Sequence, residues 1–178
     1  MSFKQLVNHF KTITYHKYLV MKGCFKLGLY YQGIMHDLSK YSPTEFFVGA
    51  KFYQGTRSPN NAEREKYGHS KAWMHHKGRN KHHYEYWVDY HAPDGKMLPV
   101  EMPAKYVAEM FVDRVAASKV YNKERYKDSD SIDYYLKGNT AQFLHENTAK
   151  LLEKLLRMLA EQGEDKTYSY IRKYVLKK

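Results

Sequence analysis

Apolar side chains recur at helical spacing along most of the chain. Residues 3–13 place them at three- and four-residue intervals, which predicts an amphipathic helix. The pattern continues over residues 15–31, where Gly28 predicts a break. A further helix is then expected over residues 29–40.

Start and stop signals organise the next segment. Ser42 is a good N-cap, Pro43 suits the first helical position, and Glu45 completes a predicted capping box. Residues 55–61 have the turn chemistry of a surface loop. Residues 62–77 are expected to form another helix.

The second half of the chain also has apolar residues at helical spacing. Pro103 opens a predicted helix over residues 103–120, and a short helix is expected over 128–136. Residues 139–162 form the clearest amphipathic pattern, which Gly163 closes. A final helical segment is expected over 167–176.

These elements predict an all-α fold of about six to eight helices. The turn at residues 92–96 predicts either a small hairpin or an ordered loop near 88–100. The length favours one domain over residues 1–178. Its core is expected at about 14–120, followed by C-terminal helices at about 128–176.

The charge and cysteine content narrow the partners and the compartment. A net charge of +11 suits nucleic acid, an anionic membrane surface or an anionic small molecule. The basic residues are scattered, which disfavours a dedicated nucleic-acid face. Cys24 is the single cysteine, so an intramolecular disulfide is excluded and a cytoplasmic location is expected. Neither a signal peptide nor a membrane-spanning stretch is predicted.

A His-Asp pair at residues 36 and 37 is the first candidate for chemistry. His36 and Asp37 offer two types of metal ligand, an imidazole and a carboxylate. Lys40 follows, and it either reaches a phosphate oxygen or is a solvated lysine at a helix C-terminus. Glu45 is assigned to the capping box and not to a ligand set.

Two further residues draw attention because of their surroundings. Asp113 lies in the middle of an apolar helical pattern, and a buried carboxylate is costly unless it is paired or bound to metal. Pairing with a basic side chain is the favoured interpretation of Asp113 by itself. His16 lies in a helix that leads to His36, so antiparallel neighbours would bring these two residues together.

Five histidines fall within fifteen residues, and this density favours metal or phosphate chemistry over an exposed loop. His69 and His76 are seven residues apart and are expected on one helix face. Which member of each adjacent pair faces inward stays open. The pairs are His75 with His76 and His82 with His83.

The order of these residues resembles the HD-domain superfamily, a group of all-helical metal-dependent phosphohydrolases with the pattern H…HD…D. Residues 36–40 (His-Asp-Leu-Ser-Lys) are similar to its His-Asp-x-x-Lys form, and residues 111–114 (Phe-Val-Asp-Arg) are similar to its last Asp motif. The chain is also similar to an uncharacterised bacterial and phage family that shares the first phrase and His-His-Tyr-Glu-Tyr-Trp.

The superfamily resemblance implies a site and a reaction. One or two divalent transition ions (Mn, Fe, Co, Ni or Zn) would activate water for attack on a nucleotide or another phosphate ester. The implied ligands of the first ion are His16, His36, Asp37 and Asp113. Those of a second ion, bridged by Asp37, are His76 and His83, with His69 as a further candidate. Asp37, Lys40 and Arg114 are the implied catalytic residues.

Two other functions stay open at this point. One is a non-catalytic HD-like protein that binds a metal or a nucleotide. The other, less favoured, is a basic helical protein that binds nucleic acid. The oligomeric state is not predicted.

Overall fold

The computed structural model describes residues 1–177 and confirms the all-α prediction. This part of the chain is 71% helical, with eight α-helices and one small two-stranded hairpin. The α-helices are α1 (Phe3–Lys26), α2 (Tyr30–Met35), α3 (Pro43–Lys51), α4 (Pro59–Tyr67), α5 (Lys71–Lys77), α6 (Ala104–Asn122), α7 (Asp130–Lys137) and α8 (Glu146–Tyr170). The strands are β1 (Val88–His91) and β2 (Lys96–Pro99).

Shorter helical turns connect these elements. They are the 3₁₀ turns η1 (Leu38–Tyr41), η2 (Tyr84–Tyr86), η3 (Lys123–Arg125) and η4 (Thr140–Phe143), and the π-helical turn η5 (Ile171–Val175). None of the helices among residues 1–177 is long and apolar enough to cross a membrane.

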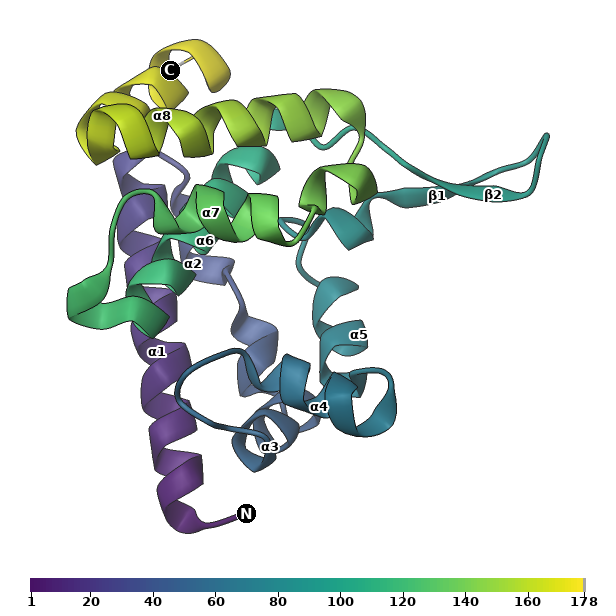
Figure 1. The fold of residues 1–178 in the computed structure, drawn as a ribbon, viewed down its shortest axis with the longest axis vertical. Coiled ribbons are helices and arrows are strands. Elements are labelled where there is room, and N and C mark those ends of the chain that lie inside the picture. The colour runs from purple at the N-terminus through teal and green to yellow at the C-terminus, as the bar shows by residue number, and fades with distance from the viewer. Residues whose placement is uncertain (178) are drawn as a thin grey trace.

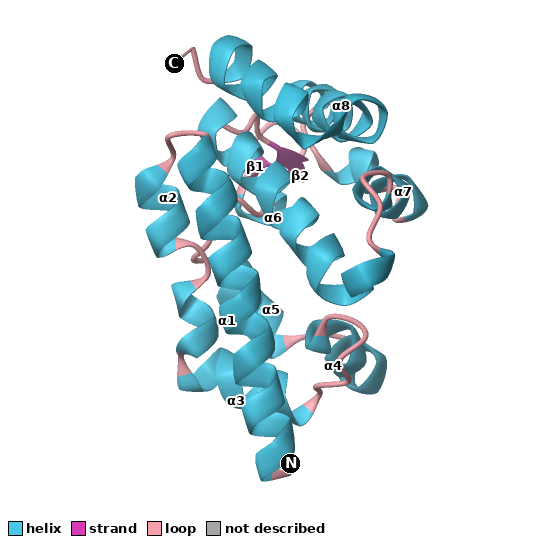
Figure 2. Cartoon of the chain, turned by 90° about the vertical axis from the view of Figure 1, so that its left-hand side faces the viewer, coloured by secondary structure: helices cyan, strands magenta, loops and turns pink. Residues whose placement is uncertain are grey.

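Helix α6 lies at the centre of the molecule. It packs against α1 and α8, and Figures 1 and 2 show these helices on either side of it. Its residues are buried around most of the helix circumference, from Val107 to Val112 without interruption. A helix that is buried on most sides belongs in an interior. Burial of α6 also forces its two carboxylates, Glu109 and Asp113, to find partners inside the protein.

The N-terminal helices differ from the prediction at one point. The break near Gly28 is confirmed, and Gly28 has a φ of 67°. The helix expected over residues 29–40 is wrong, because α2 ends at Met35 and Asp37 has a φ of 54°. A left-handed residue cannot continue a right-handed helix, and Asp is one of the few residues that tolerates this conformation. The His-Asp pair therefore lies on a turn.

The helix expected over residues 62–77 is also wrong, because it is two helices. Gly68 has a φ of 76° and ends α4, and α5 begins at Lys71 with Ser70 as its N-cap. The glycine adopts the left-handed conformation at no steric cost and stops the helix. His69 falls in the connection, so His69 and His76 do not share a helix face.

The C-terminal half follows the prediction more closely. Helix α7 and the hairpin lie where they were expected, with Val88 paired to Pro99 and Tyr90 to Met97. Helix α8 starts later than residue 139, because η4 and the extended Leu144 precede it. Gly163 kinks α8 (φ 79°, ψ 174°) without ending it. In Figure 1 the hairpin projects away from the helices.

Candidate metal centre

The turn that carries Asp37 aims its carboxylate into the protein. Helix α2 stops just before His36, and both His36 and Asp37 are only 2% exposed. The left-handed backbone of Asp37 redirects the chain into η1. A buried carboxylate needs compensation from nearby charges or an ion.

The first group of potential ligands brings together residues from α1, the turn and α6. Nε2 of His16 lies 2.9 Å from Oδ1 of Asp113 and 3.8 Å from Oδ2 of Asp37. Nε2 of His36 lies 3.2 Å from the same Oδ2 and 3.5 Å from the same Oδ1. One potential ligand atom from each of these four residues lies within 4.8 Å of all the others.

The second group contains Asp37 again, with three histidines. Nε2 of His76, on α5, lies 3.2 Å from Oδ1 of Asp37, and Nε2 of His82 lies 3.4 Å from it. His83 completes this group. The two oxygens of Asp37 therefore face different groups, which is the arrangement of a carboxylate that bridges two ions.

Most inward-facing atoms of the two groups have no hydrogen bond. Within residues 1–177, five buried Nε2 atoms and both oxygens of Asp37 lack a hydrogen-bond partner, and the five histidines are His16, His36, His76, His82 and His83. Each such group costs about 1–3 kcal/mol of desolvation. Ligands about 2.1 Å from one ion lie roughly 3–3.5 Å apart, close to the separations found here. Imidazole and carboxylate together suit a divalent transition ion.

Carboxylates behind the histidines fix the direction of the rings. Nδ1 of His36 and of His82 lie 3.0 and 3.1 Å from Oε1 of Glu109. Nδ1 of His76 lies 2.8 Å from Oε2 of Glu45. An Nδ1–H that donates to a carboxylate leaves the Nε2 lone pair free, which is the usual outer arrangement of a histidine metal site.

Glu45 is thus a correction to the sequence analysis. Ser42 makes no side-chain cap hydrogen bond, so the capping box does not form. The carboxylate of Glu45 instead accepts hydrogen bonds from His76 and, at 2.6 Å, from Nδ1 of His75. His75 is turned toward Glu45 and belongs to neither potential ligand group.

The charges of the site favour ionised carboxylates. Burial acts to raise the pKa of Asp37, but His36 and Lys40 outweigh it and hold that pKa well below its usual value. Burial also opposes ionisation of Asp113, yet the close imidazoles of His16 and His36 hold its pKa well below the usual value. Nζ of Lys40 lies 2.5 Å from Oδ2 of Asp37. Both carboxylates are therefore ready to bind a cation at neutral pH.

The surroundings of the histidines lower the pKa of two of them and raise the pKa of two others. Burial and then Lys40 lower the pKa of His16, and burial with His82 holds the pKa of His83 well below its usual value. Burial also acts to lower the pKa of His36 and His76, but the negative charge of Asp37 outweighs burial and raises the pKa of both. A metal ion at the site would compete with protons mainly at His36 and His76.

Three residues of the site are partly exposed to solvent. The side chains of Asp113 and Lys40 are 18% and 29% exposed, and His83 is half-buried. The remaining ligand candidates are buried. Any exchangeable ligand or substrate would approach past these partly exposed residues.

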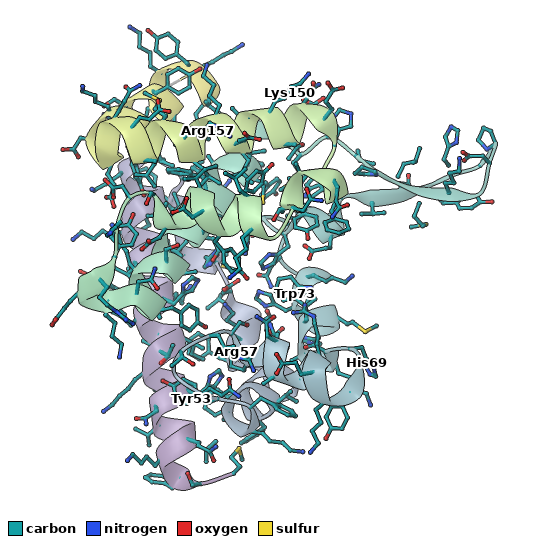
Figure 3. The ribbon with its side chains drawn as sticks, viewed as in Figure 1. Tyr53, Arg57, His69, Trp73, Lys150 and Arg157 are labelled. Carbon is teal, nitrogen blue, oxygen red and sulfur yellow. The ribbon has the colours of Figure 1, made fainter. Side chains whose placement is uncertain are left out.

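The structure brings together six of the residues expected from the sequence, and it leaves out one. His16, His36, Asp37, His76, His83 and Asp113 lie in the two groups. His69 is exposed and belongs to neither group, and Figure 3 labels it near the end of α4. His82, which the sequence left open beside His83, also lies in the second group, and Glu109 was missed. Glu109 lies four residues before Asp113, and residues four apart share one face of a helix. The sequence could therefore have predicted that Glu109 lies near the site.

The two basic residues expected near phosphate have different positions. Lys40 contacts Asp37 directly. The guanidinium of Arg114 lies 5.7 Å from the ring centre of Tyr135, and Arg114 contacts none of the potential ligands in any ion pair within residues 1–177. No contact of Arg114 within residues 1–177 therefore supports a catalytic role for it at this site.

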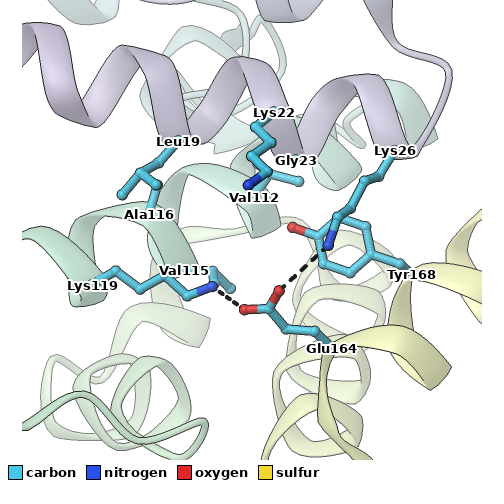
Figure 4. A pocket seen from close by; sticks show the side chains of 10 residues that line it. All are labelled: Leu19, Lys22, Gly23, Lys26, Val112, Val115, Ala116, Lys119, Glu164 and Tyr168. Atoms are coloured by element: carbon cyan, nitrogen blue, oxygen red, sulfur yellow. Dashed lines mark hydrogen bonds and ion pairs between the residues drawn. The ribbon is translucent and has the colours of Figure 1, made fainter. Parts of the chain in front are cut away.

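A separate cavity of about 120 Å³ lies between α1, α6 and α8 (Figure 4). Glu164 pairs there with Lys119 and, at 3.9 Å, with Lys26. None of the potential metal ligands lines this cavity. It is not part of the histidine site.

Fold and site together define an all-α protein with two buried His/Asp groups that could hold metal ions. The chain belongs to the family of unknown function DUF5662, whose model matches residues 5–158. This segment contains every potential ligand described above. No curated protein and no solved structure matches the chain.

Proposed function

We propose that this protein is a metal-dependent phosphohydrolase of the HD type, acting on a nucleotide or another phosphate ester. The observation that carries the proposal is the convergence of five buried Nε2 atoms without hydrogen bonds on the carboxylate of Asp37, whose Oδ2 also pairs with Lys40. Leaving so many buried polar atoms unsatisfied is costly without an ion. The order of His16, His36-Asp37 and Asp113, which resembles that superfamily, supports the same reaction.

The ligand sets follow from the two groups. His16, His36, Asp37 and Asp113 would hold one ion, and Asp37, His76, His82 and His83 would hold the other. Bound divalent ions of the Mn, Fe, Co, Ni or Zn type supply Lewis acidity and lower the pKa of a bound water.

The chain's own residues supply the rest of the chemistry. Asp37 holds the two positions together through its separate oxygens. Glu45 and Glu109 keep the imidazoles in the tautomer that directs Nε2 inward. Lys40 is partly exposed beside Asp37 and can donate to a phosphate oxygen that enters from the solvent side.

The substrate charge and the compartment are part of the same proposal. The net charge of +11 attracts an anionic substrate such as a nucleotide. A single buried cysteine is compatible with a reducing, cytoplasmic environment.

A direct test compares tag-free protein loaded separately with Mn²⁺, Fe²⁺, Co²⁺, Ni²⁺ and Zn²⁺. Hydrolysis of phosphomonoesters, phosphodiesters and nucleotides is measured for the wild type, Asp37→Asn and His69→Gln. We expect activity in the wild type and His69→Gln, and its loss in Asp37→Asn. Equal activity in all three proteins would contradict the proposal, because His69 lies outside both groups.

A second candidate is a non-catalytic protein that binds a metal or a nucleotide. The burial of most ligand candidates favours it, because only His83, Asp113 and Lys40 leave the site open to solvent. Bound metal without turnover, together with a nucleotide that raises the melting temperature, would support this candidate. Nucleic-acid binding is the third, and it predicts an affinity that falls steeply with salt.

A further inference from the structure

Glu109 contacts histidines of both metal groups through one oxygen. Its Oε1 lies 3.0 Å from Nδ1 of His36 and 3.1 Å from Nδ1 of His82. His36 belongs to the first group and His82 to the second. Glu109 is 4% exposed and sits on the buried helix α6, so solvent has little access to the shared oxygen.

The two imidazole rings are close neighbours. Their centres lie 4.3 Å apart with an angle of 34° between the ring planes. A single carboxylate oxygen can accept from both Nδ1–H groups only while both rings keep this arrangement. Movement of one ring therefore disturbs the hydrogen bond of the other.

Glu45 provides an internal comparison. It also contacts two histidines, but it does so through separate oxygens, Oε1 for His75 and Oε2 for His76. Of these two rings only His76 belongs to a metal group. Glu45 thus orients a ligand at the second position alone, whereas Glu109 orients one ligand at each position.

We propose that Glu109 is a positioning residue common to both metal positions, and that it couples their loading. This inference rests on the proposed metal centre. An ion on His36 makes its Nδ1–H a stronger donor, which holds Glu109 in place and with it the ring of His82. The ordering of Glu109 is then already complete when the second ion binds.

Cobalt titration of tag-free wild type, Glu109→Gln and Glu45→Gln tests the inference. Calorimetry and Co²⁺ absorption report the affinity of each position, and metal analysis reports the number of bound ions. We expect Glu109→Gln to weaken both positions by about ten- to a hundredfold, the usual effect of removing an outer hydrogen-bond partner. Glu45→Gln should weaken the second position by a similar factor and the first position much less, because Glu45 contacts no ligand of the first group.

The outcomes separate this inference from the proposed function. Weakening of one position only in Glu109→Gln would overturn the coupling and leave the metal centre intact. A wild type that binds no cobalt would overturn the metal centre, and the coupling with it.

A measurement on the wild type covers the case in which Glu109→Gln does not fold. Nitrogen-15 NMR of the zinc-loaded protein should find both His36 and His82 protonated at Nδ1, with both protons protected from exchange with water. Rapid exchange of the His82 proton would overturn the shared hydrogen bond.

Discussion

Nε2 of His76 lies 3.2 Å from Oδ1 of Asp37, so helix α5 reaches the turn that follows α2. The other oxygen of Asp37 faces His36, also at 3.2 Å. One side chain thus links the two histidine groups. Most of the expected behaviour of the protein follows from that link.

Removing a ligand that belongs to one group should empty that position and weaken the other only through the coupling by Glu109. Asp113→Asn is expected to weaken the first position and His83→Gln the second, because neither residue is shared. Each change should lower the metal content of purified protein from about two ions per chain to about one. Metal analysis after dialysis against buffer checks this. Loss of both ions from either variant would show that the two groups do not act as separate positions.

The effect of metal on stability should grow with pH. In the metal-free protein Asp37 raises the pKa of His36 above its usual 6.5. The resulting stabilisation is complete below about pH 6.5 and is lost as the pH rises through the folded-state pKa. The lowered pKa of Asp37 gives stability above its unfolded value, which is lost only in acid.

Metal binding has the opposite dependence, because protons leave His36 and His76 when an ion binds. The melting temperature of metal-loaded protein minus that of chelated protein should therefore increase from about pH 6 to about pH 8.5. Differential scanning fluorimetry in matched buffers measures this difference. A difference that stays constant over the interval would contradict neutral-imidazole ligation.

Gly23 allows α1 and α6 to approach closely beside the cavity of Figure 4. A Cβ at Gly23 would lie 2.5 Å from Cγ1 of Val112 and 2.8 Å from the hydroxyl of Tyr168. Gly23→Ala should reduce the free energy of unfolding by about 1–3 kcal/mol, the typical cost of overpacking. Urea denaturation gives the value.

Gly78→Ala is the matched control for that change. Its Cβ would meet no atom closer than 3.5 Å, the backbone oxygen of Met74, and its φ is −73°. Its free energy of unfolding should stay within about 0.5 kcal/mol of the wild type. Equal effects of the two alanines would refute the close approach of the helices.

Cys24 should be chemically inert in the folded protein. It is fully buried, and burial together with Glu109 raises the pKa of its thiol. The thiolate is the reactive form, so alkylation by iodoacetamide at neutral pH should be slow in buffer and fast in denaturant. Mass spectrometry follows the reaction. Labelling of the folded protein at the denatured rate would contradict this burial.

Helical periodicity was sufficient to predict the fold class, because most helices bury one apolar face. It did not locate the ends that depend on single backbone conformations. The left-handed Asp37 and Gly68 each divide an apparently continuous helix. Sequence spacing cannot reveal these conformations, since Asp and Gly also occur inside helices.

The first group could be foreseen from residue order, and the second only in part. His82 and His83 are adjacent, and the connection after α5 turns both rings inward, which spacing alone does not predict. His69 illustrates the opposite error, since a glycine one residue earlier removes it from the helix. Glu45 and Glu109 act behind the ligands, where only the packing of α3 against α5 and the burial of α6 reveal them.

The most direct measurement is the metal content of tag-free wild type and Asp37→Asn. Asn keeps the size of the side chain and tolerates the left-handed backbone. The substitution therefore removes the negative charge and leaves the local structure almost unchanged. The account predicts about two transition ions per wild-type chain and a marked loss of both in Asp37→Asn. Wild type without bound metal, or Asp37→Asn with the full content, would contradict it.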